Sequence, residues 1–392
     1  MVLMDVILKN REHPECGELK VHFPLENVEY DAVLTSAKRR GMGSALECDC
    51  LVDRMDTPYP MLKNLEGQAV NMDELDYLAK RLDSFDYYEM QQFQALCFAE
   101  EIGDVSGMIN LSFDCQQVTV ITDFTDLRQA GIDHCMARNG GCASTKDIEA
   151  VEGYPEITSL IQQQSGKITP FGVLYANDME LSYPYKGKEF PQFAYKPPVL
   201  EVEIAGDDGV SGGKWLALPM PNMMLEHYTE RMGLETYAEI LYAESNLPGE
   251  MNTIIDISRD KLYEVNRLCQ AVERLSEQDV KKLTAVSMMA KAIGAKEHEQ
   301  LAMNLDFFEF VPDVKDPEEY GRYMIQESGR FEFDPNLEDY YNYAGYADAR
   351  IEEYEGVFTS LGYVAYTGAM PLEELLHGGT SEQPFQMGGM KM

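Results

Sequence analysis

Carboxylates are by far the most abundant side chains in this sequence that could do chemistry. Its 392 residues include 68 aspartates and glutamates, against 32 lysines and arginines and six histidines, and the formal net charge is -36. With so many acids, neighbours such as Glu318 and Glu319, or Glu352 and Glu353, arise by chance, and adjacent helical positions face different directions. Such pairs therefore do not indicate the acid–base catalysis that glycosidases perform.

The histidines and cysteines show no spacing that is typical of a metal site or a nucleophilic centre. The sequence contains no H-E-x-x-H and no C-x-x-C, and a single residue between Cys48 and Cys50 is the wrong spacing for a zinc knuckle. His134 and Cys135 are sequence neighbours, which rarely form a catalytic dyad. No P-loop, nucleophile elbow or dinucleotide-binding motif occurs in a suitable context. We predict no catalytic residue, metal or cofactor, and reduced cysteines in or near the core.

The hydrophobic and basic residues indicate which classes of partner are not expected. Hydrophobic residues make up 45% of the chain and aromatic residues 10%, which predicts a folded protein rather than a disordered acidic tail. The only basic triplet, residues 38–40, is more typical of a helix end than of a DNA contact, so no direct nucleic acid binding is expected. No apolar run is long enough to span a membrane, and no signal peptide is evident. We predict a cytoplasmic protein of a bacterial host cell, with no membrane partner.

The elements that must position the acids recur at a spacing of about 190 residues. In both places four apolar residues follow one another at intervals of 3, 4 and 3, which places them on one helical face: Leu75, Leu78, Leu82 and Phe85 in the first, and Val265, Leu268, Val272 and Leu275 in the second. Residues 21–24 and 216–219 both read as a strand running into a proline, and residues 171–175 match residues 361–366. We predict a tandem duplication of two domain-sized copies.

Each copy is expected to follow one plan. A short strand (residues 19–23; 215–218) precedes two helices joined by a short turn (72–82 with 87–101; 259–275 with 277–293), where Ser276 and Asp279 predict a capping box. Further strands are expected at 118–122 and 172–175, and at 307–311 and 362–366. The predicted fold class is α+β, with small, mostly antiparallel sheets and helical hairpins in series in an elongated body.

The predicted boundaries follow the proline and glycine content. Residues 1–182 form the first copy, 183–199 a proline- and glycine-rich connector, 200–376 the second copy, and 377–392 a flexible tail.

The net charge divides almost evenly between the two halves, with -16 for residues 1–195 and -20 for residues 196–392. At the charge density of B-form DNA, one negative charge per about 1.7 Å, a net charge of -36 would cover about 60 Å, or about 18 base pairs. Mimicry of DNA therefore predicts an elongated protein.

Charge is densest in residues 306–355, where 15 acids face four bases and seven tyrosines are interleaved. Three segments here, DPEEYGRYMIQESG (316–329), LEDYYNYAGYA (337–347) and GVFTSLGYV (356–364), resemble the C-terminal part of ArdA-type antirestriction proteins. The middle segment departs from the family pattern, with Asn342 where the family favours aspartate and Ala349 before Arg350. The first copy resembles the diverged copy of long ArdA proteins from conjugative elements of gut Firmicutes.

The resemblance implies a curved, usually dimeric DNA mimic that is not an enzyme and occupies the DNA-binding groove of type I restriction–modification enzymes. We therefore predict an antirestriction protein encoded on a mobile genetic element, either a homodimer or a single chain whose two copies present the paired surface that the family forms by dimerisation. The predicted phosphate-mimicking acids are Asp306, Glu309, Asp313, Asp316, Glu318, Glu319, Glu327, Glu332, Asp334, Glu338, Asp339, Asp348, Glu352, Glu353 and Glu355 in the second copy, and Asp73, Glu74, Asp76, Asp83, Asp86 and Glu89 in the first.

Two other functions stay open on the sequence. The acids could serve an interaction scaffold for another basic protein of the same mobile element, because polyanionic surfaces attract basic partners in general. An enzyme would instead need a buried carboxylate or a Cys/His cluster in a well-formed pocket. Pull-down from a host lysate distinguishes the DNA mimic from the scaffold, since only a DNA mimic of the ArdA type should capture restriction–modification subunits.

Overall fold

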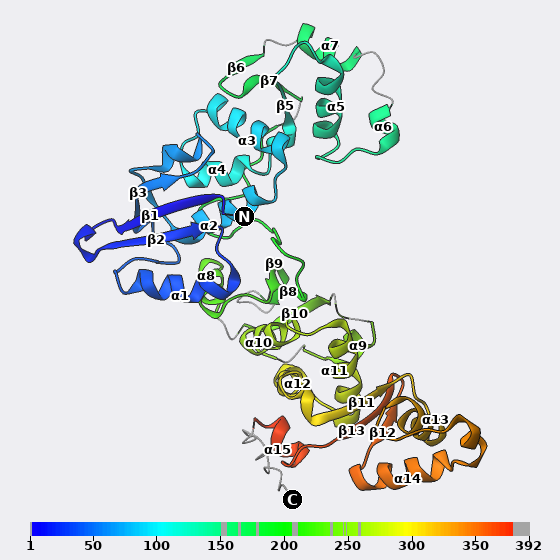
Figure 1. Cartoon of the computed structure of the whole chain (residues 1–392). Coiled ribbons are helices and arrows are strands. Elements are labelled where there is room, and N and C mark those ends of the chain that lie inside the picture. Colours follow the sequence, from blue (N-terminus) through cyan, green and yellow to red (C-terminus); the bar gives the residue numbers. More distant parts are fainter. Residues whose placement is uncertain are drawn as a thin grey trace, which may run out of the picture. The chain divides into compact units, whose positions relative to one another are not determined.

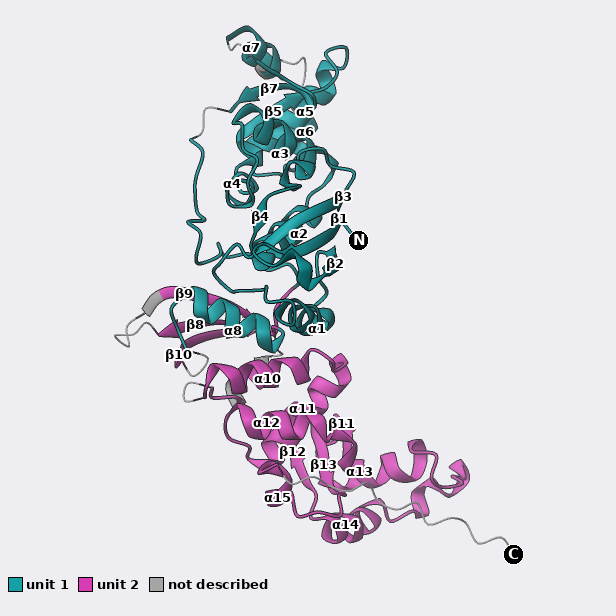
Figure 2. Ribbon diagram, turned by 90° about the vertical axis from the view of Figure 1, so that its left-hand side faces the viewer, with its two compact units in different colours: residues 1–196, 221–235 teal, residues 197–220, 236–392 magenta. Residues whose placement is uncertain are grey.

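The computed structural model describes residues 2–149, 155–163, 166–177, 180–205, 211–235, 238–245, 247, 249–257 and 260–378 (Figure 1). Two compact units are present. Unit 1 comprises Met1–Lys196 and Pro221–Glu235, and unit 2 comprises Pro197–Met220 and Thr236–Met392 (Figure 2). The structure is 47% helical with 19% strand, in small antiparallel sheets, which confirms the predicted α+β class. In the described part of the chain, no helix is long and apolar enough to cross a membrane.

Unit 1 begins with a four-stranded sheet of order β2-β1-β3-β4, formed by β1 (Met4–Asn10), β2 (Glu18–Phe23), β3 (Cys50–Asp56) and β4 (Ala69–Val70). All neighbours are antiparallel. Alternate residues of β1 and β2 are buried, as expected for strands with one face against a core. Helices α1 (Asn27–Lys38) and α2 (Met72–Asp83) follow β2 and β4 in the chain.

The rest of unit 1 contains α3 (Tyr87–Ala99), α4 (Val105–Leu111) and a sheet of order β5-β7-β6, formed by β5 (Val118–Ile121), β6 (Lys167–Thr169) and β7 (Gly172–Ala176). Helices α5 (Leu127–Arg138), α6 (Thr145–Glu149) and α7 (Pro155–Gln163) lie between β5 and β6 in the chain. A small core joins the sheet to these helices through Ile121, Ala130, Ile157, Leu160 and Tyr175. Helix α8 (Asn222–Arg231) also belongs to unit 1.

Unit 2 has a similar order of elements, although its first sheet in the described residues has three strands rather than four. Its first sheet, of order β10-β8-β9, is formed by β8 (Leu200–Ala205), β9 (Ser211–Leu218) and β10 (Ile240–Ser245), and it is followed by α9 (Gly249–Ile254), α10 (Leu262–Val272), α11 (Glu277–Ala290) and α12 (Gly294–Met303). The side chain of Ser276 caps α11, accepting from the Asp279 amide at 3.2 Å and donating to the Asp279 carboxylate at 2.7 Å. Ser276 is therefore the predicted N-cap, but the Asp279 carboxylate bonds to the Ser276 hydroxyl rather than to its backbone amide, so only half of the predicted capping box is confirmed.

The second sheet of unit 2 has the order β11-β13-β12, formed by β11 (Phe308–Pro312), β12 (Val357–Thr359) and β13 (Gly362–Tyr366). Between β11 and β12 lie α13 (Pro317–Arg322), the π-helical turn η5 (Tyr323–Glu327), the 3-10 helix η6 (Pro335–Tyr340) and α14 (Tyr343–Tyr354). Helix α15 (Leu372–Leu376) follows. The core contains a stacked pair of tyrosines, Tyr320 and Tyr363, whose ring centroids are 4.0 Å apart.

The two halves of the chain share their strand orders. In the first sheet of each half, the order β2-β1-β3 corresponds to β9-β8-β10. In the second sheet, the order β5-β7-β6 corresponds to β11-β13-β12. The helix pairs α2–α3 and α10–α11 occupy the same place in each order, and short 3-10 helices, η3 (Cys115–Gln117) and η4 (Leu305–Phe307), precede β5 and β11. Two further 3-10 helices, η1 (Pro14–Cys16) and η2 (Leu62–Leu65), occur in unit 1. The predicted copy boundaries remain a prediction, and residues 379–392 of the predicted tail lie outside the described residues.

The thiols divide by burial. Every described cysteine is free, and four of them, Cys50, Cys97, Cys115 and Cys269, are buried, whereas Cys16, Cys48 and Cys142 are exposed and Cys135 is intermediate. The expectation that the cysteines gather in or near the core therefore holds only in part.

Candidate functional site

The most acidic part of the structure is the segment of unit 2 that joins β11 to β12. This segment, residues 313–356, is called the acidic connection below. It contains 13 acidic and four basic residues, a net charge of -9. The segment at the same place in unit 1, residues 122–166 between β5 and β6, has seven acidic and three basic residues, a net charge of -4. The charge is therefore unequal between the two connections although the strand order is the same.

Exposure agrees with a surface role for nearly all the acids that the sequence predicted here. Fourteen of the 15 acids from Asp306 to Glu355 are exposed to solvent. The exception is Glu309 on β11, which is partly buried and lies 3.7 Å from Arg330 and 3.5 Å from Arg350. Glu309 thus neutralises two of the four basic side chains of the acidic connection rather than facing a partner.

Six of the exposed acids take part in local structure. Asp316 caps α13 by accepting the Glu319 amide at 2.9 Å, and Asp334 caps η6 in the same way. The remaining contacts join Asp313 to Lys281 at 2.9 Å, Glu319 to the Lys315 amide at 2.8 Å, and both Glu338 and Glu318 to Arg322 at 2.8 and 3.5 Å. Each exposed pair of this kind contributes little stability, about 0–1 kcal/mol.

The other eight exposed acids have no ion pair or side-chain hydrogen bond among the described residues: Asp306, Glu327, Glu332, Asp339, Asp348, Glu352, Glu353 and Glu355. Four of them lie between the middle of α14 and its C-cap. Asp348 and Glu352 are four residues apart, so they lie on one helical face about 6 Å apart along the axis. Glu353 and the C-cap residue Glu355 extend the cluster.

The position of this cluster is unfavourable for the helix. The C-terminal end of a helix carries a partial negative charge, so a carboxylate there costs about 0.3–1 kcal/mol, and like charges four residues apart repel. No basic residue occupies the last turn of α14 to offset this. Glu352, Glu353 and Glu355 therefore do not stabilise the end of α14, and Asp348 lies one turn before Glu352 and repels it. Below they are called the α14 cluster: Asp348, Glu352, Glu353 and Glu355.

The predicted acids of the first copy behave differently. Asp73, Glu74 and Asp76 were expected on the surface, and this expectation was wrong: all three are buried in the first turns of α2. The reason is local, because α2 begins at the cap Asn71 with its charged first turn packed inward, where the positive end of the helix dipole stabilises carboxylates. Asp76 also pairs with Lys80 at 2.7 Å. These three acids cannot reach a partner.

The other three acids of the first copy have structural partners. Asp86 and Glu89 form the capping box of α3, and Glu89 also accepts a hydrogen bond from Gln116 at 2.8 Å. Asp83 accepts a hydrogen bond from the hydroxyl of Tyr195. Of the six, only Asp86 is fully exposed. Of the acids that the sequence predicted to face a partner, those that are exposed therefore lie mostly in the second copy.

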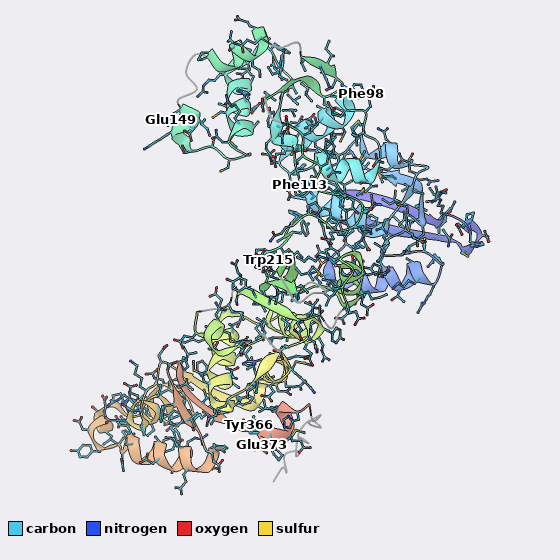
Figure 3. The ribbon with its side chains drawn as sticks, turned by 180° about the vertical axis from the view of Figure 1, so that it is seen from behind. Phe98, Phe113, Glu149, Trp215, Tyr366 and Glu373 are labelled. Carbon is cyan, nitrogen blue, oxygen red and sulfur yellow. The ribbon has the colours of Figure 1, made fainter. Side chains whose placement is uncertain are left out.

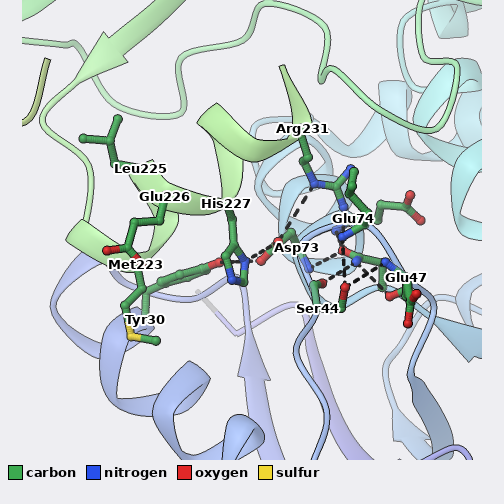
Figure 4. A network of polar contacts seen from close by, with 12 residues as sticks. Tyr30, Ser44, Glu47, Asp73, Glu74, Met223, Leu225, Glu226, His227 and Arg231 are labelled. Carbon is green, nitrogen blue, oxygen red and sulfur yellow. Dashed lines mark hydrogen bonds and ion pairs between the residues drawn. The ribbon is translucent and has the colours of Figure 1, made fainter. Parts of the chain in front are cut away.

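Asp73 is the centre of a buried network in unit 1 (Figure 4). Its carboxylate accepts a hydrogen bond from the hydroxyl of Tyr30 on α1. The other carboxylate oxygen lies 2.8 Å from Nδ1 of His227 on α8. Arg231 of α8 has its Nε 4.0 Å from the same carboxylate. Burial raises the pKa of the neighbouring carboxyl of Glu74 above its ordinary value, because the charged form loses its hydration.

Arg231 ties α8 to the residues of the predicted connector. It donates to Asn71 Oδ1 at 2.7 Å, to the hydroxyl of Tyr185 at 3.0 Å and to the carbonyl of Lys188 at 3.0 Å, and its guanidinium lies 4.4 Å from the Phe190 ring centroid. Sequence reasoning missed this network because its members lie up to 197 positions apart. Most of its polar groups bond to one another, so the network holds α8 against the rest of unit 1.

Comparison with known protein families adds one match, and it lies on the unit 2 side of the chain. Residues 207–365 match the family of antirestriction proteins (ArdA). The match contains the whole acidic connection and the helix pair α10–α11, while residues 1–206 lie outside it. The match spans less than half of the chain, and it suggests an antirestriction function. No curated protein matches the sequence.

No alternative centre of chemistry competes with the acidic connection in the described residues. Within them, no group of three or more histidine, cysteine, aspartate or glutamate side chains is arranged to hold a metal ion. A hollow of about 470 Å³ in unit 2 is lined mostly by apolar and neutral side chains, including Leu200, Tyr242 and Met251, with Glu244 as its one acid. The site that the comparison and the charges share is the exposed face of the acidic connection.

Proposed function

We propose that this chain is an antirestriction protein whose exposed carboxylates take the place of DNA phosphates on a type I restriction–modification enzyme. The observation that carries the proposal is the α14 cluster, which is exposed and unpaired in the described structure, and three of its four carboxylates oppose the dipole at the C-terminal end of the helix. It lies inside the segment that matches the ArdA family. A stability cost without a structural return is expected where a charge serves a partner.

The amount of charge is compatible with a short stretch of duplex. At one charge per about 1.7 Å, the net charge of -9 in the acidic connection corresponds to about 15 Å of B-form DNA, or between four and five base pairs. Along one strand, phosphates follow each other at about 3.4 Å of axial rise. Neighbouring phosphates also turn about the helix axis, so their separation in space exceeds this rise and is comparable with the spacing of about 6 Å between Asp348 and Glu352.

We further propose that the two halves arose by duplication and that they now differ in function. The matching strand orders support a common origin. The unequal charges, -9 against -4, and the structural partners of the acids in the first copy support a division in which the second copy engages the enzyme. Location in the cytoplasm of a bacterial host, origin on a mobile element and a paired surface within one chain are parts of the same proposal.

The test compares two variants that each remove four negative charges. The first replaces the α14 cluster with Asp348→Asn, Glu352→Gln, Glu353→Gln and Glu355→Gln. The matched control removes four exposed carboxylates of unit 1 that have no side-chain partner in the described structure, by Glu12→Gln, Glu29→Gln, Glu47→Gln and Asp56→Asn. Inhibition of DNA cleavage by a purified type I enzyme is measured for both variants, and circular dichroism checks their folding.

At about 0.5 kcal/mol for each exposed charge pair with the enzyme, the first variant should lose about 2 kcal/mol, or roughly 30-fold in affinity. The control should lose no more than about twofold to threefold. Equal losses in the two variants would mean that only net charge matters, and an unchanged first variant would refute the assigned surface. Absence of any inhibition, with capture of a different basic protein from the host, would favour the acidic scaffold.

A further inference from the structure

Three large apolar side chains are exposed within the acidic connection. Phe331 is 48% exposed, Leu337 48% and Tyr340 84%. Exposed apolar residues are ordinary when they are scattered singly, whereas neighbouring ones can form an interaction site, and Leu337 and Tyr340 are neighbours in η6. These three residues are called the η6 patch below.

The segment that carries the η6 patch is held in place by its neighbours. Leu337 and Tyr340 are three residues apart in η6, and side chains at that spacing in a 3-10 helix lie on the same side. Glu338, between them, is fixed by its ion pair with Arg322 at 2.8 Å. The Phe331 ring packs edge-on against the ring of Tyr346, with 5.5 Å between the ring centroids. The apolar groups are therefore presented on an anchored segment, which lowers the entropy that binding would cost.

The surroundings of the patch decide which partner it fits. Exposed acids without a partner in the described structure, Glu327, Glu332 and Asp339, lie within six residues of it in the chain. Membrane surfaces and nucleic acids are anionic, so this acidic segment repels both. A basic protein surface is attracted, and among basic side chains arginine both pairs with carboxylates and stacks on aromatic rings.

We propose that the η6 patch is an anchor for arginine side chains on a basic protein surface, with Tyr340 stacking on a guanidinium while the neighbouring carboxylates pair with it. The proposal deepens the function given above and rests on it for the identity of the partner. It adds aromatic stacking to the binding free energy, a contribution that carboxylates in the place of phosphates do not supply. Stacking is short-ranged and is little screened by salt, whereas the contribution of the carboxylates falls as the ionic strength rises.

Unit 1 offers a matched control. Tyr87 is 80% exposed and follows Asp86, which is also exposed, so a tyrosine beside a carboxylate occurs there as well. Tyr87 lies in the first turn of α3, outside the acidic connection. A Tyr87→Ala variant removes the same side chain from a comparable setting, and neither tyrosine contributes to a described core.

The first experiment measures binding of the full-length protein to fluorescein-labelled deca-arginine and deca-lysine by fluorescence anisotropy, at several salt concentrations. The wild type should bind deca-arginine about tenfold more tightly than deca-lysine, because only the guanidinium stacks. Tyr340→Ala should reduce this preference to about twofold without changing the salt dependence, Leu337→Ala should weaken both peptides equally, and Tyr87→Ala should have no effect. An unchanged preference in Tyr340→Ala, or an equal loss in Tyr87→Ala, would overturn the proposal.

The second experiment separates this inference from the proposed function. Tyr340→Ala is compared with wild type as an inhibitor of a purified type I enzyme at low and at moderate salt. The expected loss is about tenfold at both, as for an aromatic anchor at an interface. Inhibition that depends on the α14 cluster but not on Tyr340 would overturn only the anchor. An arginine preference that depends on Tyr340, in a protein that does not inhibit restriction, would overturn only the proposed function.

Discussion

Replacing Arg231 by methionine tests whether the buried network holds unit 1 together. The side chain of Arg231 is 1% exposed and that of Asp73 2%, and Arg231 makes three hydrogen bonds to groups of the same unit. Methionine keeps most of the volume and removes the charge, which leaves the carboxylates of Asp73 and Glu74 buried with less compensation. Breaking a buried pair on one side typically costs 3–5 kcal/mol.

The assay can tell the two units apart. The single tryptophan, Trp215, lies on β9 in unit 2, so its fluorescence follows unit 2, whereas circular dichroism follows both (Figure 3). With a urea dependence of about 2.5 kcal/mol/M for a unit of this size, Arg231→Met should move the unit 1 transition down by about 1–2 M. As a control, Lys167→Met removes a cation from the exposed Lys167–Glu100 pair and should cost less than about 1 kcal/mol.

Two results would contradict this reasoning. A change of less than about 1 kcal/mol for Arg231→Met would show that the guanidinium and the carboxylates of α2 are not energetically coupled. A loss of the same size for Lys167→Met would show that removal of any cation from this acidic protein has the observed effect. In a double-mutant cycle, Asp73→Asn with Arg231→Met should cost less than the sum of the two single changes.

Three further predictions concern single features. Because burial raises the pKa of Glu74, the folded state binds the Glu74 proton more tightly than the unfolded state does, and the free energy of unfolding falls as the pH rises above about 4.5. Glu74→Gln should therefore stabilise unit 1 at pH 7. In urea titrations this gain should vanish at acid pH. A Cβ at Gly321 would lie 2.0 Å from the carbonyl oxygen of Tyr343, so Gly321→Ala should destabilise unit 2 by more than about 2 kcal/mol in thermal unfolding, whereas Gly103→Ala, with open space around it, should change little. Burial raises the pKa of the Cys115 thiol to about 12, so a thiol reagent should label the native protein at the exposed cysteines first and label the four buried ones only after unfolding: Cys50, Cys97, Cys115 and Cys269.

Local patterns predicted the elements well where period and caps were strong. The helix expected at residues 72–82 is Met72–Asp83, and the strand expected at 118–122 is Val118–Ile121. The strand at Met4–Asn10 was not predicted, because its residues alternate between apolar and polar only in part: Val6, Ile7 and Leu8 are consecutive apolar residues. The recurrence of apolar spacing near residues 75 and 265 also pointed to the matching helix pairs of the two halves.

The site was harder to predict because exposure is not written in composition. Acids in the first turn of α2 and acids in the last turn of α14 look alike in the sequence, yet the first are buried beside the positive end of a helix dipole and the second face solvent. Asn71, directly before the helix, was the available signal, since a cap marks the turn in which acids serve the helix. The contact of Asp73 with His227 depends on tertiary packing across 154 positions and had no local signal.

The most direct test of the central claim is the dissociation constant of the full-length protein for a purified type I restriction–modification enzyme, measured from 50 to 200 mM salt with and without duplex DNA that carries the recognition site. If carboxylates replace phosphates, affinity should fall steeply with salt, by a logarithmic slope of up to about 0.9 for each contact, and DNA should compete for the same site. An affinity that ignores salt, or a stable complex of enzyme, DNA and this protein together, would contradict the account.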